Sequence, residues 1–259
     1  MKLGVIAGTG FYDLTGGETL PVDTPWGPVE VAASKRKDRT IFFLARHGSE
    51  HQRPPHRVEH RANVWALAAC GVERVLAVNT VGSLHLDWKP GTFVVPSDFV
   101  DFSGRAATFF DDEAVHVDMT EPYCPQARKA LLAAARPAAR EGVYACTQGP
   151  RLETPSEIRL LSQVADVVGM TGYPEVVLAR EKGLCYASLC VVSNPAAGLA
   201  RSLPIDEVLR NARRSEKRVR ETILAALLAL PARRACGCRE AAEKARIGAT
   251  TKAPRARRQ

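Results

Sequence analysis

Polar residues that could bind an anion follow several segments of this chain that are expected to form buried strands. Gly8-Thr9-Gly10 offers backbone N–H groups and a hydroxyl, and Arg46-His47 adds a guanidinium fork suited to phosphate. Thr80, Thr171 and Ser193 supply further hydroxyls. Each residue alone fits a tight turn, a surface ion pair or a strand cap. Together they predict one composite pocket for an anion.

The apolar pattern indicates the elements that must position these residues. Strands are expected within residues 2–8, 39–48, 73–84, 91–102, 142–154, 165–183 and 185–194, and helices within 60–70, 124–142, 154–164, 165–183 and 204–230. This alternation predicts an α/β fold with a largely parallel sheet. Ligands of such sheets bind beyond the strand ends, where the polar residues occur.

Charge divides the chain into a single domain, residues 1–231, and a basic tail, residues 232–259. The whole chain of 259 residues carries a formal charge of +8. The tail holds nine Lys or Arg and two Glu, hence +7, so the domain carries only about +1. A tail of this composition is expected to be disordered and solvated, and the nearly neutral domain argues against a nucleic-acid partner. No apolar run reaches the ~18 residues of a membrane span, and no signal peptide is recognisable, so a cytoplasmic protein is expected.

The seven cysteines do not suggest a disulfide framework, because their number is odd and most lie in apolar segments. Cys236-Gly237-Cys238 is the exception. This spacing would suit a redox loop or half of a metal site, but no second Cys or His pair lies nearby in the sequence. The two thiols are therefore interpreted as ordinary residues of the tail.

Several longer motifs carry a family resemblance. The segments "IAGTGF", "RHGSEHQRPPHRVEHRANVWAL", "GPRLET", "GMTGYPEVVLAREKGLCYASL" and "SNPAAG" occur in the order seen in trimeric purine nucleoside phosphorylases. Over roughly residues 3–228 the chain resembles this family, most closely its methylthioadenosine phosphorylase branch. The resemblance implies an α/β domain with a mixed central sheet flanked by helices. It also implies a homotrimer, with a hexamer as the alternative, and phosphorolysis with inorganic phosphate as co-substrate and neither metal nor organic cofactor.

The resemblance also assigns roles by position. The phosphate-binding residues would be Thr9, Arg46, His47, Thr80, Thr171 and Ser193. Met170 would lie under the ribose, and Leu152 beside the base, where the family often has an aromatic residue. The apolar pocket for a methylthio group would be formed by Ile205, Val208 and Leu209, with His116 contributed by a neighbouring subunit. The alternative for these three aliphatic residues is a place in the core.

Glu153 and Asn194 are expected to read the purine and assist its departure. A carboxylate only accepts hydrogen bonds, so Glu153 fits the N1–H of a 6-oxopurine and repels the bare N1 of a 6-aminopurine. The Asn194 amide can donate to O6 and accept from N7–H as the base leaves. The adenine-handling branch of the family has Asp at this position, a second Asp where this chain has Ala196, and a small residue in place of Glu153. The alternative is that Glu153 pairs with Arg151 and Asn194 only caps a turn.

A 6-oxopurine site combined with an apolar 5′ site predicts phosphorolysis of S-methyl-5′-thioinosine to hypoxanthine and 5-methylthioribose 1-phosphate. The alternatives are S-methyl-5′-thioadenosine and ordinary 6-oxopurine nucleosides. A non-catalytic nucleotide sensor and a nucleoside hydrolase are disfavoured, because neither accounts for the full set of predicted phosphate-binding residues.

Overall fold

The structure is a computed structural model, and it describes residues 1–8, 17–48, 52–106, 108–135, 139–199, 202 and 204–247. The strands are β1 (Lys2–Ala7), β2 (Glu18–Val22), β3 (Val29–Arg36), β4 (Arg39–Ala45), β5 (Arg74–Ser83), β6 (Phe93–Asp101), β7 (Ala139–Cys146), β8 (Val167–Gly169) and β9 (Cys185–Pro195). The helices are η1 (Pro55–Arg57), α1 (His60–Ala69), α2 (Pro125–Ala134), α3 (Pro155–Leu161), α4 (Gly172–Glu181), α5 (Ile205–Arg214), α6 (Glu216–Ala229) and α7 (Ala241–Lys244).

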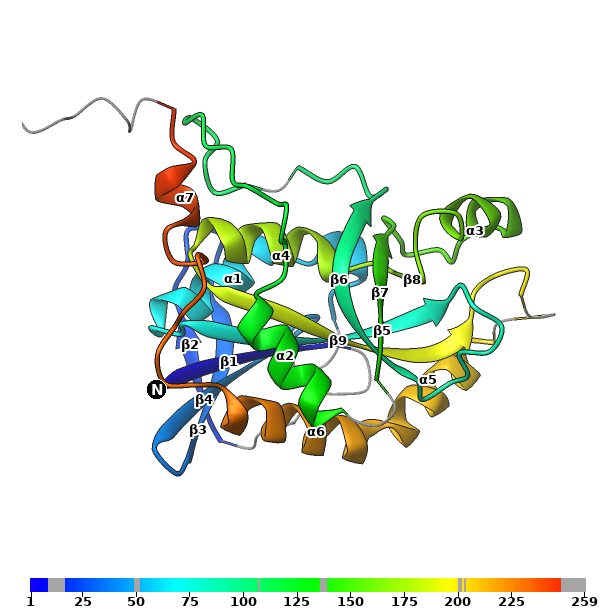
Figure 1. Cartoon of the computed structure of the whole chain (residues 1–259), viewed down its shortest axis with the longest axis horizontal. Helices are drawn as coiled ribbons and strands as arrows, with labels where there is room; N and C mark the ends of the chain where they lie inside the picture. Colours follow the sequence, from blue (N-terminus) through cyan, green and yellow to red (C-terminus); the bar gives the residue numbers. More distant parts are fainter. Residues whose placement is uncertain are drawn as a thin grey trace, which may run out of the picture.

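The described strands form one mixed sheet in the order β2-β3-β4-β1-β5-β8-β7-β6-β9, which confirms the mixed α/β fold (Figure 1). β4, β1, β5 and β9 run parallel to one another, whereas β2 and β3 add antiparallel strands at one edge. β5 also pairs with β9, so β5, β8, β7, β6 and β9 close into a ring. Because the ring closes, strands that are far apart in the sequence become direct neighbours, and their ends lie close together.

Helices cover both faces of the sheet. On one face, α2 and α6 pack through Leu131 and Ile223 against strand residues such as Leu76. On the other face, α1 and α4 contribute Leu67 and Val176 to a second cluster. No helix in the described part of the chain is both long and apolar enough to span a membrane.

Three expectations from the sequence differ from the structure. The edge strands β2 and β3 were not expected, and β2 is almost wholly exposed, so it lacks the apolar signal used to find strands. β7 begins at Ala139, inside the segment expected to be helical. The long helix expected over 204–230 is broken at Ser215, where the side chain donates back to the Asn211 carbonyl oxygen and ends α5.

The basic tail also differs from expectation over the part that the structure describes. Residues 232–247 pack against the domain, and Cys238 is buried in the main core cluster. Arg234 donates to the Gly183 carbonyl oxygen, and the Ala235 N–H donates to the Gln126 side chain. Net charge does not register such local contacts, which explains why composition predicted disorder here. Residues 248–259 lie outside the described residues.

Candidate active site

A cavity of about 590 Å³ lies where β4, β5, β8 and β9 end, and α5 closes one side of it. Its walls contain most of the residues that the sequence predicted: Arg46, His47, Thr80, Leu152, Glu153, Met170, Thr171, Ser193, Asn194, Ile205, Val208 and Leu209. Thr9 lies outside the described residues. His116 is exposed and is not among the residues that line the cavity of a single chain.

Arg46 follows β4 and is fixed by three hydrogen bonds. Its Nε and Nη2 donate to the two carboxylate oxygens of Glu175 at 2.5 and 2.9 Å, and its Nη1 donates to the Val78 carbonyl oxygen at 2.8 Å. Arg46 is 1% exposed and Glu175 is 0% exposed, so the alternative of a surface ion pair is wrong. The pair is buried in the cavity wall.

The sequence did not point to Glu175, which is an acidic residue on the buried face of α4. Burial raises the pKa of Glu175, but the charge and the hydrogen bonds of Arg46 outweigh this effect, and the pKa is lowered to about 2. The Tyr186 hydroxyl donates to the same carboxylate at 3.0 Å. His60 Nδ1 lies 3.4 Å from it, and burial lowers the pKa of His60. A carboxylate with these neighbours stays ionised and keeps the guanidinium in one orientation.

The side chains of Arg46 and His47 both lie close to Gly8. A Cβ atom at Gly8 would lie 3.0 Å from Arg46 Nη1 and 3.2 Å from His47 Nε2. The His47 Nδ1–H donates to the Arg53 carbonyl oxygen at 2.8 Å, because a carbonyl oxygen can only accept. Because glycine has no side chain, space remains at Gly8 beside the Arg46 guanidinium and the His47 imidazole, as an anion site requires.

The Thr171 hydroxyl is oriented by a buried network. Its Oγ1 accepts from Asn79 Nδ2 at 3.1 Å, and Asn79 Oδ1 accepts from Ser188 Oγ at 2.5 Å. The Tyr144 hydroxyl oxygen accepts from the Thr171 N–H at 3.2 Å. Since Oγ1 accepts from Asn79, the hydroxyl can donate its own hydrogen to an anion in the cavity. Asn79, Ser188 and Tyr144 gave no functional signal in the sequence.

A β-bulge places Ser193 and Asn194 together in the cavity wall. The register of β5 with β9 pairs Val81 with Val192 and then Gly82 with Asn194, so Ser193 is the extra residue. Successive strand residues normally face opposite sides, and a bulge changes that alternation. Both side chains therefore line the cavity.

The Asn194 amide is held by short-range bonds. Ser193 Oγ lies 2.6 Å from Asn194 Oδ1 and 3.2 Å from the Val81 carbonyl oxygen, and Asn194 Nδ2 donates to the Pro195 carbonyl oxygen at 2.8 Å. From α5, Asn211 Nδ2 donates to the Ser193 carbonyl oxygen at 2.8 Å. A purine that engages this amide must compete with the bonds that hold it.

Glu153 is oriented by a hydroxyl and not by an arginine. Thr147 Oγ1 donates to Glu153 Oε1 at 2.6 Å. Arg151 instead forms a bidentate pair with Glu157, at 2.7 and 2.8 Å, so the alternative of a Glu153–Arg151 pair is wrong. Glu157 also completes the capping box with Thr154, the N-cap of α3. The Glu153 carboxylate faces the cavity as a hydrogen-bond acceptor.

The apolar end of the cavity is formed by the first turns of α5. Ile205 is 61% exposed, and Val208 and Leu209 are half-buried, so the alternative of a place in the core is wrong for all three. Arg213 also lines the cavity, one turn beyond Leu209 on the same helix face. Sequence reasoning missed this guanidinium.

The comparisons with known proteins agree with this geometry. The model of the phosphorylase superfamily matches residues 2–228. The chain is 46% identical to the probable S-methyl-5′-thioinosine phosphorylase of Methanopyrus kandleri, covering 95% of this chain and 99% of that protein. It is 42% identical to the 6-oxopurine nucleoside phosphorylase of Pyrococcus furiosus, covering 93% and 97% respectively.

The fold also has solved counterparts. The methylthioadenosine phosphorylase from Schistosoma mansoni in complex with adenine superposes with a TM-score of 0.88 at 33% identity, covering 95% of this chain and 98% of that one. Identity at this level over nearly the whole length goes beyond a shared fold. The chain therefore belongs to the phosphorylase superfamily, as an enzyme of the purine nucleoside phosphorylase type.

Proposed function

We propose that the protein catalyses phosphorolysis of S-methyl-5′-thioinosine, giving hypoxanthine and 5-methylthioribose 1-phosphate. The observation that carries this proposal is the presence of two different walls in one cavity. Glu153 and Asn194 line it with an acceptor and an amide, whereas Val208 and Leu209 line it with aliphatic groups. The first wall suits a 6-oxopurine and the second suits a thioether.

The phosphate would bind between Gly8, Arg46 and the Thr171 hydroxyl. In the reaction an oxygen of HPO4²⁻ bonds to C1′ while the C1′–N9 bond breaks, and the electron pair of that bond leaves with the purine. The proton of the phosphate passes through solvent to N7 of the purine, which gives neutral hypoxanthine and the sugar phosphate dianion. Positive charge develops on the sugar, so the bound phosphate anion stabilises the transition state. Because Glu175 balances the charge of Arg46, this arginine acts mainly by positioning the phosphate.

The purine would be recognised through its N1–H, O6 and N7. Glu153 Oε accepts from N1–H, Asn194 Nδ2 donates to O6, and Asn194 Oδ1 accepts from N7–H as the base departs. A 6-aminopurine would place its N1 lone pair against the Glu153 carboxylate and its amino group against the Asn194 N–H. Each buried mismatch costs about 1–3 kcal/mol, which favours the 6-oxopurine.

Arg213 favours a second candidate, phosphorolysis of ordinary 6-oxopurine nucleosides. Its guanidinium lies at the α5 side of the cavity and could donate to a 5′-hydroxyl, which a thioether cannot match as an acceptor. The relative from Pyrococcus furiosus is named for this activity. Methylthioinosine remains the proposed substrate, because three aliphatic side chains of the same helix line the cavity beside Arg213.

The proposal also includes a homotrimer, because the predicted role of His116 requires a neighbouring subunit. The resemblance also predicts that the reaction needs neither a metal nor an organic cofactor. The sequence predicts a cytoplasmic location. Both statements stay predictions. Sedimentation equilibrium tests the trimer, and a His116→Ala variant tests the shared site. A monomer with full activity would contradict this part of the proposal.

The reaction class is tested by incubating the protein with methylthioinosine in the presence and in the absence of inorganic phosphate. We expect hypoxanthine only when phosphate is present, together with an equal amount of the sugar 1-phosphate. Release of hypoxanthine without phosphate would identify a hydrolase, and no release under either condition would favour a nucleotide sensor. An Arg46→Lys variant should raise the KM for phosphate, whereas Arg128→Lys, in a surface pair with Glu141, should not.

A further inference from the structure

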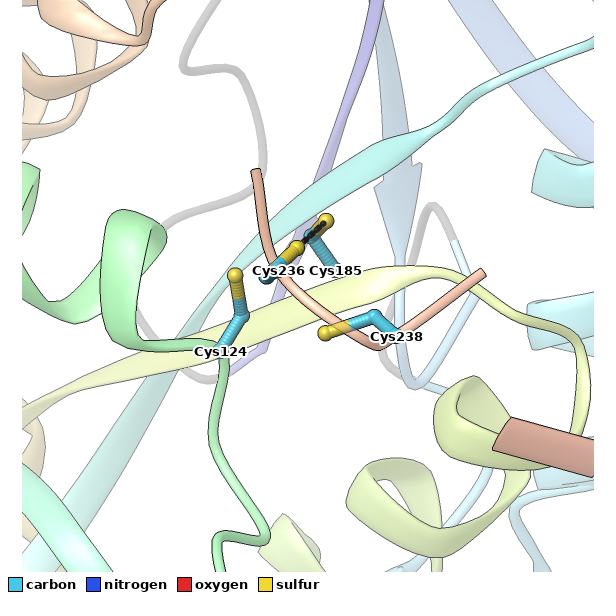
Figure 2. Close-up of side chains that lie close together, drawn as sticks. All are labelled: Cys124, Cys185, Cys236 and Cys238. Carbon is cyan, nitrogen blue, oxygen red and sulfur yellow. Dashed lines mark hydrogen bonds between the residues drawn. The ribbon is translucent and has the colours of Figure 1, made fainter. Parts of the chain in front are cut away.

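Four cysteines from three distant segments meet at the end of the sheet opposite to Ser193 and Asn194. Cys124 precedes α2, Cys185 begins β9, and Cys236 and Cys238 belong to the segment that follows α6. Figure 2 shows the four side chains gathered around one small space. All four sulfur atoms lie within 4.8 Å of one another, and Cys185 Sγ lies 3.3 Å from Cys236 Sγ.

These distances suit a tetrahedral thiolate site better than disulfide bonds. Zn–S bonds of about 2.3 Å give a tetrahedron whose sulfur atoms are about 3.8 Å apart. A disulfide requires about 2.05 Å between its two sulfur atoms. The cysteines are free thiols, and three of the four are buried. Small side-chain movements would therefore be enough to close a four-sulfur site without water as a ligand.

The surroundings supply positive charge from two arginines that form no salt bridge in the described part of the chain. Arg180 Nη1 donates toward Cys238 Sγ at 3.7 Å. Arg74 is 0% exposed and is the register partner of Cys185 on β5, so both side chains leave the same face of the sheet.

Several nitrogen atoms of these two arginines, and one of Arg234 in the segment that carries Cys236, also lack hydrogen-bond partners. Within the described part of the chain this holds for Nε and Nη2 of Arg74, and for Nε of Arg180 and of Arg234, all of them buried. Each of these guanidinium groups has an acceptor for another of its nitrogen atoms, but the remaining buried N–H groups without acceptors are costly. A zinc ion with four thiolates carries a net charge of −2, so the filled site would supply the missing negative charge.

We propose that Cys124, Cys185, Cys236 and Cys238 bind one Zn²⁺ ion in a closed, tetrahedral, structural site. Each thiol that binds loses its proton to solvent, and no change of oxidation state is involved. The site is separate from the phosphorolysis pocket, because none of the four cysteines lines that cavity. The proposal therefore does not depend on the proposed function.

The ion would fasten the C-terminal segment to the domain. Its ligands join the start of α2 and the start of β9 to residues 236–238. Farther along the same segment, the Ala245 carbonyl oxygen accepts from the His116 N–H at 3.1 Å, and Arg246 forms an isolated bridge with Val115. The site would thus stabilise the segment that holds the loop carrying His116.

The test is the metal content of the full-length protein, purified in a reducing buffer, supplied with Zn²⁺ and then freed of unbound ions. We expect close to one zinc per chain for the wild type and little or none for Cys236→Ser. Cys70→Ser is the matched control, since Cys70 is also a partly exposed free thiol but lies outside the cluster. This control should keep the full zinc content.

A second measurement keeps the proposal testable if Cys236→Ser does not fold. Wild-type protein supplied with Co²⁺ should develop the visible absorption bands of a tetrahedral cobalt thiolate, and added Zn²⁺ should remove them. Wild-type protein that binds neither ion while all seven thiols titrate as free would overturn the proposal. Two disulfides that persist in the purified protein, with four thiols missing from the titration, would overturn it as well.

Discussion

Glu175 binds Arg46 through both carboxylate oxygens, at 2.5 and 2.9 Å, in a wall that exposes neither side chain to solvent. The pair links α4 to the end of β4, and Arg46 Nη1 still faces the turn at Gly8. The guanidinium is therefore oriented before any anion arrives. Preorganised donors of this kind do not have to be reoriented during the reaction.

Replacing Glu175 by Gln should weaken both stability and phosphate binding. The substitution leaves a buried guanidinium without its counter-charge, which typically costs about 3 kcal/mol of unfolding free energy. Urea unfolding measures this loss, and steady-state kinetics should show a higher KM for phosphate. Glu157→Gln is the matched control, because it alters an exposed pair and keeps the capping box. An equal loss of stability in both variants would contradict the account.

Replacing Asn194 by Asp should shift the base preference toward the 6-aminopurine. A carboxylate cannot donate to O6, whereas it can accept from a 6-amino group. We expect the ratio of kcat/KM for methylthioadenosine to that for methylthioinosine to rise about tenfold. The shift should be incomplete while Glu153 is present. If the ratio does not move, Asn194 does not read the base.

Replacing Val208 by Ser should affect the methylthio substrate selectively. Loss of apolar contact with the thioether is expected to lower kcat/KM for methylthioinosine about tenfold and to change the value for inosine much less. Leu228→Ser is the control, since Leu228 is a partly exposed residue of α6 that does not line the cavity. A parallel loss for both nucleosides would indicate a structural effect rather than substrate recognition.

Acid should destabilise the protein through His60. Burial lowers its pKa, and the nearby charges of Arg46 and Arg105 act in the same direction, although Glu175 opposes them. The unfolded chain therefore binds a proton near pH 6.5 that the folded chain does not. The stability present above about pH 6.5 should fall as the pH decreases, by at most about 1.4 kcal/mol per pH unit.

Urea unfolding of the wild type and of His60→Asn at pH 7.5 and pH 5.5 measures this contribution. Over this interval the stability of the variant should depend less steeply on pH than that of the wild type. Glu175 does not titrate there, because its pKa is about 2. Equal slopes for both proteins would show that His60 is not the responsible group.

Sequence reasoning identified the buried strands and the residues at their ends, because apolar runs and polar ends are local signals. It could not identify the layer behind those residues. Glu175 lies on the buried face of α4, and its partner Arg46 is 129 positions away. The bulge at Ser193 depends on the register of two strands, which local patterns do not fix.

The cysteines show the same limit in another form. The spacing of Cys236 and Cys238 would suit half of a metal site, but no second Cys or His pair lies nearby in the sequence, so the sequence alone favours two ordinary tail thiols. The structure brings Cys124 and Cys185 to them through α2 and β9. Ligand pairs supplied by separate elements become visible only when the strand order is known.

Comparison of kcat/KM for methylthioinosine, methylthioadenosine and inosine at saturating phosphate tests the central claim most directly. We expect the highest value for methylthioinosine, because only this nucleoside satisfies Glu153 and Asn194 together with the aliphatic face of α5. A higher value for methylthioadenosine would contradict the assignment of the base site. A higher value for inosine would contradict the assignment of the 5′ site and would favour recognition of a hydroxyl by Arg213.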